Sequence, residues 1–202
     1  MPKISYIRAR QILDSRGTPT VEVDMAFEGQ KLVRSSVPSG ASTGSYEAVE
    51  LRDNTADFLG KGVSKAVENI NKIIANHIIN SEFEGIIDFD KKLTNLDSTS
   101  NKSKLGANAI LACSLSFTKC LAQLNNKELF QSLYENSEYL LPTPLMNIIN
   151  GGAHANNGLD IQEFMIVPAG FGSFSESLRA GVEIFMNLKK ILNNKNYSTA
   201  VG

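Results

Sequence analysis

The chain has 202 residues, of which 42% are hydrophobic, and its formal net charge is −1. This composition is typical of a globular chain with enough mass for a sizeable core in one or two domains. The charge balance argues against nucleic-acid or anionic-membrane partners, because no basic excess is available to neutralise phosphates. No apolar run approaches the roughly 20 residues of a membrane span, and the N-terminus lacks the apolar core of a signal peptide. We therefore expect a cytoplasmic protein.

The first 37 residues predict strands. Residues 21–27 alternate between large apolar side chains and polar or small ones, which is the period-two pattern of a half-buried strand. A turn at 28–30 leads into a returning segment at 31–37, and an earlier strand is expected at 4–9. Together these segments predict a three-stranded antiparallel meander.

A run of small residues, SGASTGS at 39–45, follows the predicted strands. Most runs of this kind are flexible connections between elements. A loop of hydroxyls and glycines can also close over a ligand, because its N–H groups and hydroxyl oxygens can approach closely. The sequence pattern by itself leaves both interpretations open.

Helices are predicted beyond residue 60. Apolar residues recur at spacings of three and four from Val63 to Ile78, which indicates an amphipathic helix, and His77 within it is expected on the surface or packed rather than as a ligand. Residues 105–124 are apolar nearly all round and predict a buried central helix. Its two cysteines, Cys113 and Cys120, would lie about 10 Å apart along one face and are predicted to be buried free thiols.

A last helix of this region is expected at 127–139, with Leu129, Phe130 and Leu133 making its contacts. Asn, Ser, Glu and two prolines around 136–144 then predict a domain boundary.

The segment 144–168, PLMNIINGGAHANNGLDIQEFMIVP, combines two apolar runs with a polar, glycine-rich loop. The runs, 145–149 and 164–167, predict buried strands. If they pair antiparallel, His154, Gln162 and Glu163 gather at one mouth of the sheet, with Asp160 nearby. Such a group on a rigid scaffold is a plausible functional site. The alternative is a glycine-rich turn whose polar residues hydrogen-bond the loop itself.

The remaining residues predict one helix and the start of a strand. Ser173 and Glu176 form an S-x-x-E capping box, and an apolar stripe follows at 178, 185, 188 and 192. The final NYSTAVG predicts a short turn that leads into another strand.

Four long segments carry a resemblance to one family. They are ARQILDSRGTPTVEVD at 9–24, VPSGASTGSYEAVELRD at 37–53, NKSKLGANAILACSLS at 101–116 and NIINGGAHANNGLDIQEFMIVP at 147–168. In this order and spacing the chain resembles the N-terminal part of enolase, the phosphopyruvate hydratase of glycolysis, over essentially all 202 residues. The resemblance implies an α+β domain at 1–138, an antiparallel β-meander followed by helices. At 139–202 it implies the opening ββα part of an enolase-type α/β barrel, truncated.

The resemblance also implies a carbon–oxygen lyase that dehydrates 2-phosphoglycerate to phosphoenolpyruvate with Mg²⁺, as a homodimer when full length. In the family, metals stabilise an enolate-like intermediate while a lysine removes the proton and a glutamate protonates the departing hydroxyl. Ser42 resembles the mobile-loop ligand of the second magnesium, and His154 resembles the loop histidine that closes near the substrate. Gln162 resembles the substrate-binding glutamine, and Glu163 the carboxylate that supports the hydroxyl-leaving step.

The family's acid, base, first-magnesium carboxylates and phosphate-binding residues would follow residue 202. A complete barrel needs on the order of 250 residues, so we expect the 202-residue chain alone to be inactive. Two other functions stay open. A non-catalytic truncated fragment would act as a folding or interaction module. A metal hydrolase using His154 and Asp160 would need a second ligand cluster with metal spacing, which the sequence does not offer.

Overall fold

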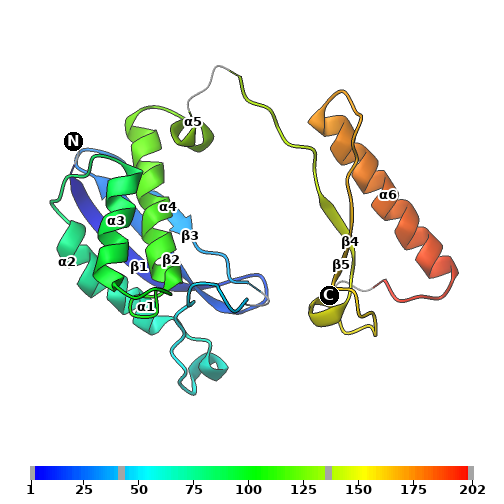
Figure 1. Cartoon of the computed structure of the whole chain (residues 1–202), viewed down its shortest axis with the longest axis horizontal. Helices are drawn as coiled ribbons and strands as arrows, with labels where there is room; N and C mark the ends of the chain where they lie inside the picture. The colour runs from blue at the N-terminus through cyan, green and yellow to red at the C-terminus, as the bar shows by residue number, and fades with distance from the viewer. Residues whose placement is uncertain (1–2, 41–43, 135–137, 200–202) are drawn as a thin grey trace. The chain divides into compact units, whose positions relative to one another are not determined.

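The computed structural model describes residues 3–40, 44–134 and 138–199. The chain divides into two compact units, Met1–Asn136 and Ser137–Gly202, here called the first and the second unit. Figure 1 shows the elements of each unit along the chain. Within the described ranges, no helix is both long and apolar enough to cross a membrane.

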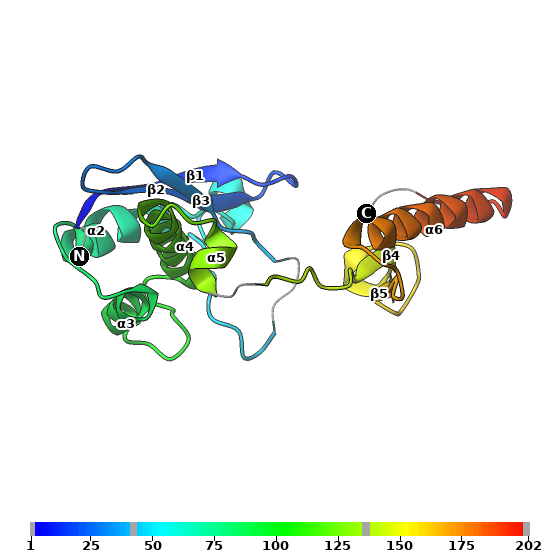
Figure 2. The same cartoon turned by 90° about the horizontal axis from the view of Figure 1, so that it is seen from above.

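The first unit opens with the predicted antiparallel meander. Its strands are β1 (Ile4–Leu13), β2 (Pro19–Phe27) and β3 (Val33–Ser36), in the order β1-β2-β3. Helices of this unit cover one face of the sheet (Figure 2). β1 extends beyond the predicted 4–9, because residues 10–13 continue to pair with the start of β2.

β2 is more buried than its alternating sequence predicts. Val21, Val23 and Met25 are fully buried, as expected for the core face, but Asp24 on the other face is also only 5% exposed. The guanidinium groups of Arg10 and Arg34 cover its carboxylate and donate hydrogen bonds to it. A charged network, which alternation alone does not reveal, therefore covers the polar face of the strand.

The amphipathic helix predicted from Val63 to Ile78 is present, in three segments. These are α1 (Ser64–Glu68), the π-helical η2 (Asn69–Ile74) and α2 (Ala75–Ile78), preceded by the 3₁₀ segment η1 (Asp57–Gly60). In η2, the Asn71 side chain accepts a hydrogen bond from Ala9 N and donates one to Ala9 O. It thereby satisfies backbone groups of the edge strand β1, which would otherwise be free to pair with another strand. His77 is exposed, as predicted.

The central helix is α4 (Ala107–Leu124), which packs against β2, β3 and α3 (Ile86–Asp97). Its Phe117 makes ring contacts with Phe27, Phe83 and Phe89. The helix is not buried all round as predicted, because Leu111 is 43% exposed. Cys113 and Cys120 are buried free thiols, as predicted, and burial raises the pKa of Cys120 to about 12.

The helix predicted at 127–139 is much shorter. Only α5 (Leu129–Leu133) forms, and residues 135–137 lie outside the described ranges. α5 contacts α4, although its expected contact residues Phe130 and Leu133 are more than half exposed. A capping box between Glu128 and Gln131 stabilises its first turn.

The second unit contains β4 (Met146–Asn150), the 3₁₀ turn η3 (Gly152–His154), β5 (Glu163–Ile166) and α6 (Phe174–Asn194). β4 and β5 pair antiparallel, as predicted, and form an open two-stranded sheet. The strands were expected to be buried, but every residue of both is at least partly exposed. A strand at the chain end is not seen up to Thr199, and residues 200–202 lie outside the described ranges.

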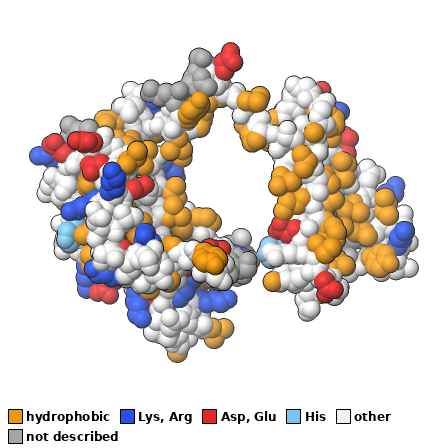
Figure 3. Space-filling view, viewed as in Figure 1, with side chains coloured by type: hydrophobic (Ala, Val, Ile, Leu, Met, Phe, Trp, Pro, Cys, Tyr) orange, Lys and Arg blue, Asp and Glu red, His pale blue; other side chains and the backbone are white. Residues whose placement is uncertain are grey.

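α6 begins at its predicted cap, where Glu176 N donates a hydrogen bond to Ser173 Oγ. Its apolar stripe remains largely uncovered among the described residues. Leu178 and Phe185 are more than 40% exposed, and Figure 3 shows hydrophobic side chains gathered over this unit. The helix and its apolar stripe were therefore predicted correctly, and the stripe leaves an open apolar face.

Candidate functional site

The β4–β5 connection is held in shape by a glycine pair. Gly151 N donates to Gln162 O (2.9 Å), and Gly152 N donates to Leu159 O (2.6 Å). A Cβ on Gly151 would lie 2.4 Å from Ile161 O and 2.8 Å from Leu159 O, so only glycine fits there. The two ends of the connection therefore approach each other closely, immediately beyond the paired residues Asn150 and Glu163.

This close approach brings together three of the four predicted site residues. His154 Nδ1 lies 3.0 Å from Glu163 Oε1, and His154 Nε2 lies 2.7 Å from Gln162 Nε2. The side chains of His154 and Glu163 are 22% and 28% exposed, so both are partly sheltered yet reachable from solvent. The imidazole is thus held between a carboxylate and an amide at the mouth of the sheet, as the antiparallel pairing predicted.

The hydrogen-bond geometry assigns roles to the ring nitrogens. A carboxylate only accepts hydrogen bonds, so Nδ1 carries the proton and its N–H donates a hydrogen bond to Glu163. With the proton on Nδ1, Nε2 can accept a hydrogen bond from the Gln162 amide. A carboxylate behind a histidine fixes its tautomer and orientation in this way in many active sites. The arrangement can hold a proton on Nδ1 and leaves part of the Glu163 carboxylate available to a ligand.

Asparagines that the sequence reasoning did not single out support the same loop. Asn157 Nδ2 donates to Asn150 O (2.8 Å), and Asn157 Oδ1 accepts from Leu159 N (3.2 Å). Asn147 Nδ2 donates to Asn150 Oδ1 (2.5 Å). The repeated asparagines of this segment were a possible signal, since Asn side chains often hydrogen-bond nearby backbone groups in turns. The interpretation of the loop as a self-bonded turn is therefore correct in part.

The fourth predicted residue, Ser42, lies outside the described ranges, as do its neighbours 41 and 43. The segments on either side of it are anchored within the first unit. Arg52 donates to Ser39 Oγ (2.9 Å) and Glu50 Oε1 (2.6 Å), and Gly44 N donates to Glu47 Oε1 (2.9 Å). The assignment of Ser42 as a magnesium ligand remains a prediction.

The described residues do not supply a metal centre by themselves. Across 3–40, 44–134 and 138–199, no group of three or more His, Cys, Asp or Glu side chains could hold a metal ion. Asp160 is exposed, and no described contact joins it to His154. The hydrolase hypothesis therefore has no structural support, and Mg²⁺, which prefers several oxygen ligands, does not fit the described residues alone.

Two protein-family models match the chain. One is described as "Enolase, N-terminal domain" and covers residues 4–133, and the other as "Enolase, C-terminal TIM barrel domain" and covers residues 138–202. The chain belongs to the enolase family. The meander-and-helix unit is thus the N-terminal portion of an enolase, and the β4–β5–α6 unit is part of its barrel domain. The His154, Gln162 and Glu163 cluster lies in the barrel portion of this enolase chain.

Proposed function

We propose that this chain acts in the Mg²⁺-dependent dehydration of 2-phosphoglycerate to phosphoenolpyruvate, the phosphopyruvate hydratase step of glycolysis. The observation that carries the proposal is the imidazole of His154 held between Glu163 and Gln162, in a chain of the enolase family. Family membership supports a lyase of this kind, and it is also the basis for expecting Mg²⁺, since enolases generally use it.

In this proposal the three side chains bind the substrate and assist the loss of its hydroxyl group. The reaction removes a proton from C2 and releases the C3 hydroxyl as water, so polar groups must face both the hydroxyl and the charged ends of the substrate. The Gln162 amide would hydrogen-bond the substrate. Glu163 would orient the departing hydroxyl, and His154 would close beside it while its Nδ1–H holds the carboxylate in position.

We further propose that turnover requires the rest of the enolase barrel in addition to the part within residues 138–202. The described part of the second unit has two strands in an open sheet, whereas barrel enzymes assemble their sites from loops of many strands. A homodimer, a cytoplasmic location and Ser42 as a magnesium ligand belong to the same proposal.

The exposed apolar side chains of the second unit favour one other candidate function, a non-catalytic interaction module. Exposed apolar surface of this kind commonly marks a protein contact. An enolase assay separates the two proposals, because an interaction module would form no phosphoenolpyruvate even when the remaining part of the barrel is added.

The decisive experiment measures phosphoenolpyruvate formation from 2-phosphoglycerate, with and without Mg²⁺. It compares the 202-residue protein with a chain in which residues 1–202 are continued by the remaining part of an enolase barrel, so that Glu163 occurs once. We expect turnover only in the second. There, Glu163→Gln preserves shape but removes the charge, and should lower turnover at least about tenfold, or roughly 1.4 kcal/mol of barrier.

The matched control is Glu183→Gln, the same chemical change at an exposed position of α6, which should leave turnover unchanged. Near-normal turnover of Glu163→Gln would refute its assignment. Unchanged magnesium dependence of Ser42→Ala would refute that of Ser42, and absence of turnover in the continued chain would refute the proposed activity itself.

A further inference from the structure

The sequence contains two Asn-Gly pairs, Asn150-Gly151 and Asn157-Gly158, and both lie in the β4–β5 connection. Asn-Gly is the dipeptide most open to attack of a backbone nitrogen on the preceding side-chain amide. The reason is steric, because glycine has no Cβ to obstruct the five-membered ring that forms. On sequence alone the two pairs are equivalent, so any difference between them comes from the fold.

The fold protects the first pair. Gly151 is buried, and its amide N–H is committed to Gln162 O at 2.9 Å. Asn150 ends β4 and pairs with Glu163, and its side-chain oxygen accepts a hydrogen bond from Asn147. Attack by Gly151 N would require this end of the sheet to open.

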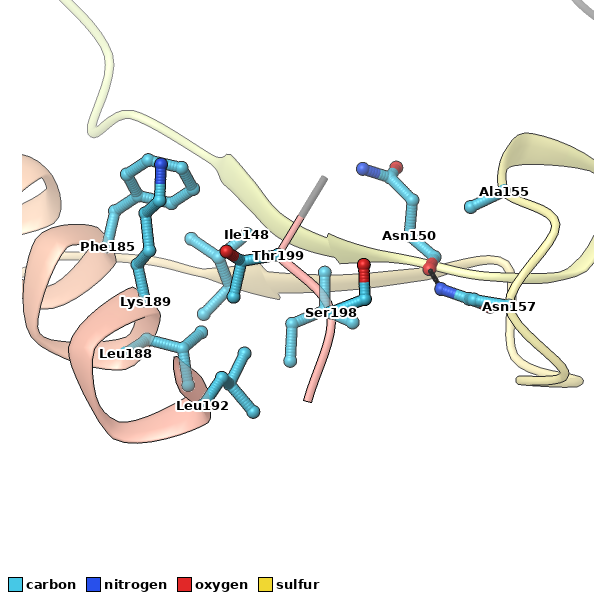
Figure 4. A pocket seen from close by; sticks show the side chains of 11 residues that line it. Ile148, Asn150, Ala155, Asn157, Phe185, Leu188, Lys189, Leu192, Ser198 and Thr199 are labelled. Carbon is cyan, nitrogen blue, oxygen red and sulfur yellow. Dashed lines mark hydrogen bonds between the residues drawn. The ribbon is translucent and has the colours of Figure 1, made fainter. Parts of the chain in front are cut away.

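The second pair is accessible. Asn157 and Gly158 are both exposed, and no heavy atom beyond the two flanking residues would lie within 4 Å of a Cβ on Gly158. Among the described residues, Gly158 N has no hydrogen-bond partner. The Asn157 side chain is held by two hydrogen bonds, to Asn150 O and from Leu159 N, and Figure 4 shows the first of them. Hydrogen bonds of this kind contribute only about 1 kcal/mol each, so the side chain can leave them.

We propose that Asn157 is a site of spontaneous deamidation in the folded protein, whereas Asn150 is protected. Gly158 N attacks Asn157 Cγ, the N–Cγ bond forms, and the Cγ–Nδ2 bond breaks. The departing NH₂ group takes up the proton lost from Gly158 N and leaves as ammonia. Water then opens the resulting succinimide at either carbonyl and yields aspartate or isoaspartate. The net change is an amide plus water converted to a carboxylic acid plus ammonia.

The modification would loosen the loop that carries His154. The donor Nδ2, which ties the loop to Asn150 O, is replaced by a carboxylate oxygen that repels the carbonyl oxygen. The hydrogen bond from Leu159 N can persist, because a carboxylate still accepts it. The loop would then keep the hydrogen bond from Leu159 N and lose the hydrogen bond to Asn150 O at the end of β4.

The test follows both asparagines in one sample of the full chain. The protein is incubated at mildly alkaline pH, which favours the attacking deprotonated nitrogen, and is then digested and analysed by mass spectrometry. Deamidation appears as the mass gain of replacing NH₂ by OH, with separate chromatographic peaks for aspartate and isoaspartate. A parallel incubation in concentrated urea gives the rates in the unfolded chain.

In the folded protein we expect residue 157 to deamidate at least about tenfold faster than residue 150, because position 150 reacts only after local opening. In urea the two rates should be similar. Both asparagines fall on one peptide, so fragment ions assign the modified residue. Asn157→Gln, whose longer side chain disfavours the five-membered ring, should remove the modification at residue 157 and leave that at Asn150 unchanged. Equal rates in the folded protein, or the same preference in urea, would overturn the proposal, and neither outcome depends on enolase activity.

Discussion

The charge network on the meander offers the sharpest test of how the first unit is stabilised. The Asp24 carboxylate accepts hydrogen bonds from Arg34 Nε (2.7 Å) and Nη2 (3.0 Å) and a third from Arg10. These bonds, to Arg34 first and Arg10 second, hold the pKa of Asp24 well below its usual range. Asp24→Asn removes the negative charge. It also places the NH₂ of the new side-chain amide opposite the N–H groups of the arginines, where donor faces donor.

Hydrogen bonds to a charged group contribute about 1.5–3 kcal/mol. The side chains of Arg10 and Arg34 are 36% and 61% exposed, so solvent screens part of this gain. We therefore expect Asp24→Asn to lower the free energy of unfolding by about 2 kcal/mol at neutral pH. With a urea slope of about 2 kcal/mol per molar for a small unit, the unfolding midpoint should fall by about 1 M.

The pH dependence follows from the direction of the Asp24 pKa shift. Because the folded-state pKa is depressed, the stabilisation is present above the ordinary carboxyl pKa of about 3.9 and is lost as pH falls through the lower folded value. The difference between wild type and Asp24→Asn should therefore shrink below about pH 4.

The measurement is hydrogen exchange of β2 peptides along a urea series, since the chain has no tryptophan to report unfolding by fluorescence. Asp57→Asn, the same change at an exposed position, is the control and should have little effect. A loss below about 0.5 kcal/mol, the usual size of a surface substitution, or a difference that persists unchanged in acid, would refute this account of the network.

Two further predictions concern the second unit. Limited proteolysis of the 202-residue protein should cut first after about residue 140, because an isolated two-stranded sheet with an open apolar face is marginally stable; a resistant second unit beside a labile first unit would contradict this. Gly151→Ala should accelerate hydrogen exchange of peptides covering 146–166 by at least about tenfold, since its Cβ would displace backbone at Ile161 and Leu159, and overpacking costs about 1–3 kcal/mol. Peptides of the first unit serve as the internal control, and unchanged exchange at 146–166 would show that the loop has more room than the structure gives it.

Local patterns in the sequence determined which segments form strands or helices and which side chains meet at the candidate site. Period-two alternation located β2, three-and-four spacing located the helical segment from Val63 to Ile78, and a Ser-Glu pair located the start of α6. The sequence predicted that three side chains lie together, those of His154, Gln162 and Glu163. They are within ten residues of one another, on a connection whose geometry follows from antiparallel pairing. Contacts between sequence neighbours depend mainly on backbone geometry, which the residue pattern encodes.

Only the tertiary structure decided what depends on residues distant in sequence. The side chain of Asn71 bonds Ala9 across the edge of the sheet, and the Asp24 carboxylate is covered by arginines from both neighbouring strands. Neither partner follows from a local period, because each is selected by how the packed elements meet. The same holds for the two Asn-Gly pairs, which have identical side chains in one loop. One glycine nitrogen is bonded within the sheet and the other is exposed, so their different environments exist only in the folded chain.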